Sequence, residues 1–238
     1  METKKGDFVE LKFTGKFNGV VFDSNIEEDL KKLQPDAKPL ETIIAIGESM
    51  VVNGLDKALE GKEIGKQYTI AVSAQEGFGE RKRELMKTLP LKTFTEKNIS
   101  PYPGMILSMD DMLVKIITIS GARVITDFNN PLAGKPLEYT FTMIRKVENP
   151  EEQTKAFFAY FFRFVPEFEI KESVTVKGPK GMDVFINAFK ERFKKLIGKE
   201  LVFQMEESKP KKEEKAQKIA SLEAEEQAKE VNEVASTP

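Results

Sequence analysis

The stretch VVFDSN, residues 20–25, places one carboxylate, that of Asp23, directly after three apolar residues. The chain has no histidine, cysteine or tryptophan. This composition excludes a thiolate nucleophile, a zinc–sulfur site and a Ser-His-Asp triad. If the chain is an enzyme, its reaction needs little proton transfer. Carboxylate chemistry, lysine chemistry, and catalysis by desolvation and shape then remain as mechanisms.

Asp23 also has a purely structural interpretation. An aspartate at the end of a strand commonly begins an Asx turn, here into Ser24 and Asn25. The hexapeptide taken alone favours the turn. A turn and a role at the rim of a pocket can coexist, so the surrounding sequence has to decide.

The bulk composition is that of an ordinary soluble protein. The 238 residues suffice for one large domain or two to three small ones. The formal net charge of −2 directs the chain neither to nucleic acid nor to an anionic membrane. No apolar run approaches the roughly 20 residues that cross a bilayer, and the N-terminal residues lack the apolar core of a signal peptide. We therefore expect a cytoplasmic protein.

The first third of the chain predicts strands around one short helix. Asn18-Gly19, between apolar residues, is a strong signal for a two-residue hairpin turn. Asn53 is the expected N-cap of the helix, and Gly61 closes it. Residues 24–39 are polar and contain prolines, so we expect a loop there. The expected strands lie in residues 6–23, which form the hairpin, and in 43–46 and 67–73.

Residues 85–129 read instead as a series of hairpins. Turns are indicated at Asp110-Asp111 and Ser120-Gly121, between apolar runs. Residues 137–147 then resume the alternation of a longer strand. Because the sequence on both sides reads as one sheet, we expect a small β domain inserted into another domain.

A third unit is expected at 149–206. Asn149 followed by Pro150 is a strong helix start, and apolar residues at helical spacing indicate a second helix that ends at Gly198. With a hairpin and a final strand this makes a small α/β domain, which packing on another domain or on a second copy would help to stabilise. Residues 207–238 mix both charge signs without any aromatic residue, which predicts a disordered or partly helical tail.

Five stretches occur together in the order and approximate spacing of one protein family: LKFTGKF, VVFDSN, VVNGLDKALEGKEIGKQYTIAV, FGE and NPLAGKPLEYTF. The chain resembles FKBP-type peptidyl-prolyl cis-trans isomerases. The insertion between FGE and NPLAGK is similar to that of the SlyD-like branch, which carries a chaperone domain in the flap, and the α/β unit resembles the long archaeal type. These likenesses imply a multidomain α+β fold: an antiparallel FKBP sheet wrapped on a short helix (1–84 and 130–148), the inserted chaperone domain (85–129), a C-terminal α/β domain (149–206) and the tail (207–238).

The resemblance also implies a proline pocket. Its catalytic candidates are Asp23, Phe78 and Tyr139, and the backbone N–H of Val52 is expected to receive a substrate carbonyl. The candidates for binding the substrate are Phe13, Phe22, Val51, Val52, Leu55 and Leu132. Phe13 and Phe78 stand where the family often has tyrosine, so two hydroxyls are lost, and Leu55 replaces a tryptophan at the floor, as in other SlyD-like members.

The reaction of this family explains why so few reactive side chains suffice. The X–Pro bond turns against a barrier of roughly 18–20 kcal/mol because amide resonance makes it partly double. Resonance places charge on the carbonyl oxygen, and water stabilises that charge. A dry pocket withdraws the stabilisation and so favours the twisted amide. The resemblance therefore implies an isomerase without cofactor or metal.

The inserted region is rich in methionine. An exposed group of these flexible, polarisable side chains could adapt to many apolar segments of unfolded clients. The alternative is that the same side chains fill the small domain's own core, which is the commoner place for apolar residues. The client-binding candidates are Met86, Met105, Met109 and Met112.

The leading hypothesis is a peptidyl-prolyl isomerase and folding chaperone whose partners are unfolded or proline-containing polypeptides. One rival is a non-catalytic holdase that only grips apolar segments. Another is a structural protein that forms a homodimer through residues 149–206. Neither nucleic acid nor membrane is expected as a partner, because no recognition module accompanies the lysines and arginines at 190–199.

Overall fold

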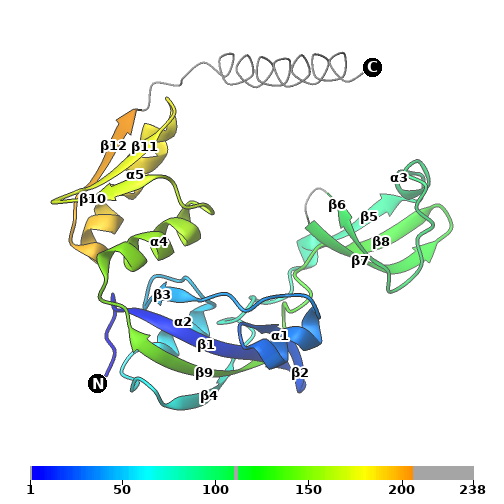
Figure 1. Cartoon of the computed structure of the whole chain (residues 1–238). Coiled ribbons are helices and arrows are strands. Elements are labelled where there is room, and N and C mark those ends of the chain that lie inside the picture. The colour runs from blue at the N-terminus through cyan, green and yellow to red at the C-terminus, as the bar shows by residue number, and fades with distance from the viewer. Residues whose placement is uncertain (1, 110–111, 206–238) are drawn as a thin grey trace, which may run out of the picture. The chain divides into compact units, whose positions relative to one another are not determined.

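The computed structural model describes residues 2–109 and 112–205 and shows a mixed α+β fold with three separate sheets (Figure 1). The chain divides into two compact units, and the boundary along the sequence falls between Arg163 and Phe164. Among the described helices, none has both the length and the apolar character that crossing a membrane requires.

The first sheet is antiparallel and forms the frame of the first unit. Its strands, in spatial order, are β2 (Val20–Ser24), β1 (Phe8–Phe17), β9 (Leu137–Lys146) and β4 (Gln67–Val72), and β3 (Ile43–Ala45) pairs with β1. The hairpin predicted at Asn18-Gly19 is confirmed. Both residues have positive φ, +48° and +79°, and Phe17 pairs with Val20 across the turn.

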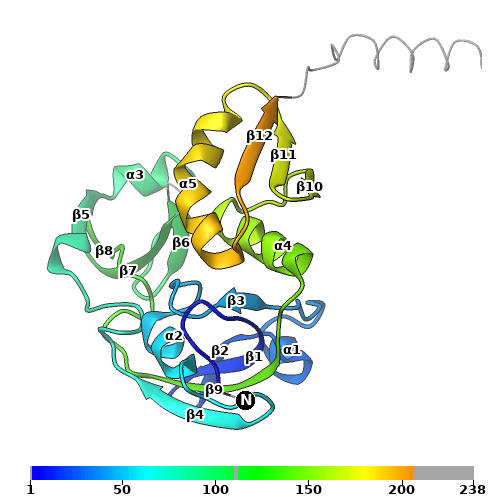
Figure 2. The same ribbon diagram turned by 90° about the vertical axis from the view of Figure 1, so that its left-hand side faces the viewer.

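Helix α2 (Asn53–Leu59) lies against the curved sheet, as both views show (Figures 1 and 2). Its inner face buries Leu55 and Leu59 completely. The prediction of Asn53 as N-cap is wrong. The cap is Val52, whose carbonyl accepts the Asp56 N–H at 3.0 Å, and no side chain caps the helix. Asn53 is instead the first helical residue.

Helix α1 (Glu27–Leu33) occupies part of the segment that the sequence predicted as a loop, so that prediction is wrong there. None of its residues is buried, and therefore the apolar spacing that marks most helices is missing. The helix is stabilised on its surface by ion pairs between Glu27 and Lys31, at 2.6 Å, and between Asp29 and Lys32, at 2.5 Å.

The inserted sheet is also antiparallel. Its order is β5 (Met86–Pro90), β8 (Arg123–Asp127), β7 (Met112–Ser120) and β6 (Ile106–Met109). A short 3-10 turn η1 (Arg83–Leu85) precedes it, and α3 (Lys92–Thr95), which the sequence analysis did not predict, brings Phe94 onto the core with Ile116 and Val124. The Ser120-Gly121 turn is confirmed by the pairing of Ser120 with Arg123. The turn at 110–111 lies outside the described residues.

Helix α4 (Pro150–Phe161) follows the first sheet's last long strand. Its predicted start is confirmed, because the Asn149 side chain accepts the Glu151 N–H at 2.8 Å and Pro150 opens the helix. Glu152 pairs with Arg145 of β9 at 2.8 Å. The helix thus belongs to the first unit, and the division after Arg163 differs from the boundary at 149 expected from the sequence.

The second unit contains three strands and one helix. The strands are β10 (Phe168–Ile170), β11 (Val174–Gly178) and β12 (Leu201–Met205), with β11 and β12 parallel. Helix α5 (Met182–Ile197) packs along β12, as Figure 2 shows, and ends as predicted at Gly198, which has φ +76°. Residues 207–238, predicted as a tail, lie outside the described residues.

Candidate functional site

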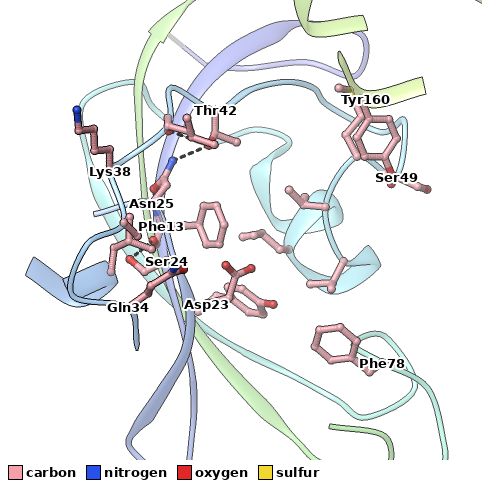
Figure 3. A pocket seen from close by; sticks show the side chains of 18 residues that line it. Phe13, Asp23, Ser24, Asn25, Gln34, Lys38, Thr42, Ser49, Phe78 and Tyr160 are labelled. Carbon is pink, nitrogen blue, oxygen red and sulfur yellow. Dashed lines mark hydrogen bonds between the residues drawn. The ribbon is translucent and has the colours of Figure 1, made fainter. Parts of the chain in front are cut away.

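The first unit contains a cavity of about 730 Å³ between the sheet, α2 and the loops around them (Figure 3). Phe13, Asp23 and Phe78 point into it from different sides in this view. Most of the site residues implied by the family resemblance line this single cavity: Phe13, Asp23, Val51, Val52, Leu55, Phe78 and Tyr139. They come from five separate parts of the chain: β1, β2, residues 51–55, the loop after β4, and β9.

Two of the implied residues lie elsewhere. Phe22 does not line the cavity but stands behind its wall, where its ring meets those of Phe78 and Tyr139 edge to face. Leu132 is placed in the turn before β9, where its N–H binds the Asn130 side chain at 2.8 Å. It is not one of the residues around the cavity.

The register of the sheet explains how Asp23 and Tyr139 come together. Gly15, on the central strand β1, pairs with Asp23 on one side and with Tyr139 on the other. A Cβ atom on Gly15 would lie 2.8 Å from the Phe22 ring and 2.9 Å from the Tyr139 ring. Because glycine has no side chain, both rings can cover the strand at this point. This role was not predicted from the sequence, although a glycine inside a strand is a signal for such a close approach.

The aromatic wall is a connected set of rings. The Phe22 centroid lies 5.8 Å from that of Tyr139 and 5.9 Å from that of Phe78, with interplanar angles of 88° and 76°. The Phe13 centroid lies 6.2 Å from that of Tyr139. Edge-to-face packing at these distances is favourable and fixes each ring relative to the next. Phe22 therefore holds the walls in place although it does not reach the cavity.

Asp23 projects its carboxylate among these rings. Although the residue as a whole is exposed at the rim, loss of water around the carboxylate raises its pKa, and the Ser24 N–H offsets part of that increase. The Asx turn considered above is not formed, because the Asn25 N–H donates to the Phe13 carbonyl at 3.3 Å. Asp23 is thus a partly desolvated acid facing a cavity.

Asn25, two residues after Asp23, ties β1 to the loop before β3. Its side-chain oxygen accepts the Phe13 N–H at 2.8 Å, and its amide nitrogen donates to the Leu11 carbonyl at 2.6 Å and to Thr42 at 2.9 Å (Figure 3). These bonds fix the backbone that carries the Phe13 ring. From the sequence, Asn25 was predicted only as a turn residue.

Two hydrogen-bond donors at the cavity have no partner within residues 2–109 and 112–205. One is the Tyr139 hydroxyl, whose pKa is raised by burial and, to a lesser extent, by the Asp23 charge, so it keeps its proton at neutral pH. The other is the Val52 N–H, just before the first turn of α2. Both are available to a carbonyl oxygen in the cavity.

The loop that leads to Val51 and Val52 is held by a buried acid. The Asp56 carboxylate accepts the N–H groups of Gly47 and Ser49, each at 2.8 Å. Ser49 has φ +56° and Gly47 has φ +79°, conformations that such bonds help to maintain. Asp56 is only 5% exposed, so these hydrogen bonds satisfy a charge that would be costly to bury alone.

Comparison with known proteins identifies the family to which this chain belongs. A family model described as FKBP-type peptidyl-prolyl cis-trans isomerase matches residues 1–95. A short-type peptidyl-prolyl cis-trans isomerase from Methanocaldococcus jannaschii is 30% identical over 155 residues, which cover 63% of this chain and 97% of that relative. The chain belongs to the family of FKBP-type peptidyl-prolyl cis-trans isomerases.

Within this FKBP family the chain is SlyD-like. The FKBP-type isomerase SlyD of Haemophilus influenzae is 30% identical over 132 residues, covering 50% of this chain and 63% of the relative. SlyD of Helicobacter pylori is 28% identical over 157 residues, covering 64% of this chain and 78% of the relative. A second family model, described as the FKBP26 IF domain, matches residues 87–132, which include β6, β7 and β8.

The four methionines of this FKBP chain's insertion are placed differently from one another. Met105 and Met109 pack against the insertion's own core, so for them the core interpretation holds. Met86 is partly buried, and its sulfur lies 3.6 Å from the Arg81 guanidinium. Met112 is 46% exposed. Other exposed apolar side chains of the insertion are Tyr102, Ile106 and Leu113, which the methionine count did not reveal.

Part of the cavity's lining was not predicted from the sequence. These residues belong to α1, the following loop, the segment before Val51, and α4: Leu30, Gln34, Ala37, Lys38, Leu40, Thr42, Ser49, Met50 and Tyr160. The first of these segments had been predicted as an ordinary loop. Tyr160 had been assigned to the C-terminal domain, and only the fold brings it to the FKBP cavity.

Proposed function

We propose that this chain catalyses the cis-trans isomerisation of X–Pro peptide bonds in the 730 Å³ cavity. The observation that carries the proposal is the convergence of aromatic walls, a partly desolvated acid and two unused donors on one hollow. Rotation about an amide bond breaks no covalent bond, so the reaction requires no nucleophile. It requires a site that favours the twisted amide over the planar one.

The side chains suit that preference. The rings of Phe13, Phe78 and Tyr139 exclude water from the bond, which weakens the solvation of the planar, charge-separated amide. The Val52 N–H and the Tyr139 hydroxyl can bind carbonyl oxygens of the peptide and hold it in register. The Asp23 carboxylate then faces the twisting bond or the rings around it, where a fixed charge can respond to the changing amide dipole.

A peptide assay that needs no protease tests this function. Exchange between cis and trans signals of a short prolyl peptide is measured with the wild-type chain, with Asp23→Ala and with Glu148→Ala, an exposed control outside the cavity. We expect wild type and the control to accelerate exchange equally, and Asp23→Ala to lower kcat/KM by about tenfold or more, equivalent to about 1.4 kcal/mol. Wild-type exchange at the uncatalysed rate would refute the proposal.

We further infer that the inserted domain holds unfolded clients. Ile106 and Leu113 lie on the outer face of β6 and β7, each 55% exposed, and Tyr102 is 61% exposed. Grouped apolar side chains that stay in water are typical of surfaces for other polypeptides. The inserted domain and the cavity belong to one polypeptide chain. A client bound to the domain would therefore meet the proline cavity at a raised effective concentration.

A non-catalytic holdase is the second candidate function. It is favoured by Phe13 and Phe78, which supply apolar surface but no hydroxyl groups to the cavity. A holdase suppresses the aggregation of a client at stoichiometric amounts and leaves the exchange of short prolyl peptides unchanged. The peptide assay above therefore separates the two functions.

We also propose a homodimer through the second unit. β12 is an edge strand of the described three-stranded sheet, and its Val202 and Met205 side chains are 40% and 57% exposed. Edge strands with exposed apolar residues are common pairing surfaces. Light scattering on the full chain and on Val202→Lys tests this: the proposal requires twice the chain mass for wild type and a shift towards the chain mass for the variant.

A further inference from the structure

A second cavity of the first unit, of about 300 Å³, lies beside the inserted sheet. Its lining comes mainly from β6, from β7 and from the segment that leads from β8 to β9. Among the described residues, none lines both this cavity and the larger one. We call it the neck cavity and define it by six of its residues: Arg81, Ile106, Leu113, Lys115, Ile117 and Lys135.

The apolar part of the neck cavity is the outer face of the β6–β7 hairpin. Leu107 of β6 and Ile116 of β7 pack in the insertion's own core. Because successive side chains of a strand point to opposite faces, Ile106 and Leu113 lie on the other side of the sheet. Each of the two is 55% exposed. The fold thus leaves apolar surface in water at this cavity.

The charged part of the neck cavity is mainly positive. Asp127 is the acid of the lining, and its carboxylate already accepts hydrogen bonds from the Arg81 guanidinium and, at 2.7 Å, from the Asn129 amide. Lys115 and Lys135 have no carboxylate partner within residues 2–109 and 112–205. A ligand that combines apolar groups with carboxylates would therefore complement the cavity in both respects.

The chain itself contains a segment of that chemistry. Residues 219–238, IASLEAEEQAKEVNEVASTP, lie outside the described residues. The segment has five glutamates and one lysine, which gives a formal charge of −4. Its larger apolar residues are Ile219, Leu222, Val231 and Val234, and these alternate with the glutamates along the sequence. It therefore offers both kinds of group that the neck cavity lacks.

The segment is joined to β12 through residues 206–218, which can extend over up to about 45 Å. Because segment and cavity belong to one chain, they meet at an effective concentration rather than at the bulk one. Helix α5 also carries lysines, but Glu191 and Glu200 stand among them, and Lys194 pairs with Glu200 at 2.5 Å. The neck cavity offers cations together with a hollow apolar surface.

We propose that residues 219–238 dock in the neck cavity of their own chain. The apolar residues of the segment contact Ile106 and Leu113, and its glutamates face Lys115 and Lys135. This contact does not depend on isomerase activity. Ile106 and Leu113 also belong to the surface proposed above for clients, so a docked segment competes with unfolded polypeptides for the inserted domain.

A spin label in the full chain tests the contact. The chain has no cysteine, so Ser236→Cys provides a single attachment site for a nitroxide. Amide NMR signals are compared before and after chemical reduction of the label. Docking with a dissociation constant at or below an effective concentration of about 1 mM fills the cavity at least about half of the time. We therefore expect the Ile106 and Leu113 signals to lose about half of their intensity or more.

Two variants of the labelled chain separate docking from general effects. Lys115→Glu reverses one charge of the cavity, and Lys97→Glu makes the same change at an exposed site of the same domain. We expect Lys115→Glu to abolish most of the signal loss and Lys97→Glu to retain it. About 1 M NaCl, which shortens the screening length to about 3 Å, should also abolish it. Unchanged signals of Phe94 and Val124 verify that the domain's core is intact.

Several results would overturn the proposal. They are no signal loss in wild type, an equal loss in Lys115→Glu, and a loss at residues 190–199 of α5 in place of Ile106 and Leu113. A mixture of spin-labelled chains with isotope-enriched, unlabelled chains reports contacts between copies. A loss that occurs equally in this mixture would assign the segment to a second copy and contradict docking within the chain.

Client binding distinguishes this proposal from that of the client surface. Glu225→Lys combined with Glu226→Lys changes only the segment and should prevent docking. If the segment fills the cavity half of the time, this variant should bind a carboxymethylated, permanently unfolded protein about twofold more tightly than wild type. If the spin label shows docking but client affinity is unchanged, the docking stands and the client surface fails.

Discussion

At the scale of single residues, the site contains an acid in surroundings that disfavour the ionised form of its carboxyl group. Asp23 faces aromatic rings, and its pKa is raised because water is excluded, with no cation bound to it among the described residues. A group placed in this way usually serves a function rather than stability. The proposed rotation of X–Pro bonds is such a function.

The raised pKa of Asp23 predicts a gain in stability when its charge is removed. The folded state binds the proton more tightly than the unfolded chain does, so stability due to this group falls as pH rises through the folded pKa. Asp23→Asn should therefore have a higher melting temperature than wild type at pH 7. The difference should shrink towards pH 3, where both states of wild type are protonated. A lower melting temperature for the variant at pH 7 would contradict the account.

At the scale of elements, the sheet register rather than any single motif assembles the site. The order β2, β1, β9 puts Asp23, Gly15 and Tyr139 in one row across three strands. Helix α2 closes the floor with Leu55, and the loop before it is held by Asp56. The glycine in the middle of the row is required because both aromatic rings lie over it.

Gly15→Ala tests this arrangement. The new Cβ atom would lie within 2.9 Å of the Phe22 and Tyr139 rings, so these rings must shift. We expect a loss of about 1–3 kcal/mol in the free energy of unfolding and a fall in kcat/KM for prolyl peptides. Lys12→Ala, an exposed site on the same strand, is the control. Unchanged unfolding and activity in Gly15→Ala would mean that the rings do not depend on this contact.

The sequence predicted those parts of the fold that are marked by local chemistry. The Asn18-Gly19 turn, the Asn149 cap and the Gly198 helix end were found because each depends on only a few adjacent residues. Helix α1 was missed because it buries no side chain. Tyr160 was missed because its role depends on where a distant helix packs, which no local pattern encodes.

At the scale of the whole molecule, the chain combines the cavity beside the first sheet with a separate sheet that displays apolar side chains. If the inserted domain holds clients, then its exposed residues should matter for protein substrates and not for short peptides. This difference follows because a peptide of a few residues can occupy the cavity alone, whereas an unfolded protein can bind at both places.

Replacing Ile106 and Leu113 by serine tests that division of labour. Both are exposed, so the fold should tolerate the change. We expect peptide exchange to stay within about twofold of wild type and the catalysed, proline-limited refolding of a protein substrate to slow by about tenfold. Lys97→Ser, an exposed polar site of the same domain, is the control. Unaltered refolding in the double variant would contradict the proposal that these two side chains bind clients.

The most direct measurement is the exchange rate of a Leu-Pro peptide with the wild-type chain in H2O and in D2O. If the cavity promotes rotation by excluding water, no proton is transferred in the rate-limiting step. The account therefore predicts strong acceleration with equal kcat/KM in the two solvents. No acceleration, or a kcat/KM that is about twofold or more lower in D2O, as expected for a rate-limiting proton transfer, would contradict it.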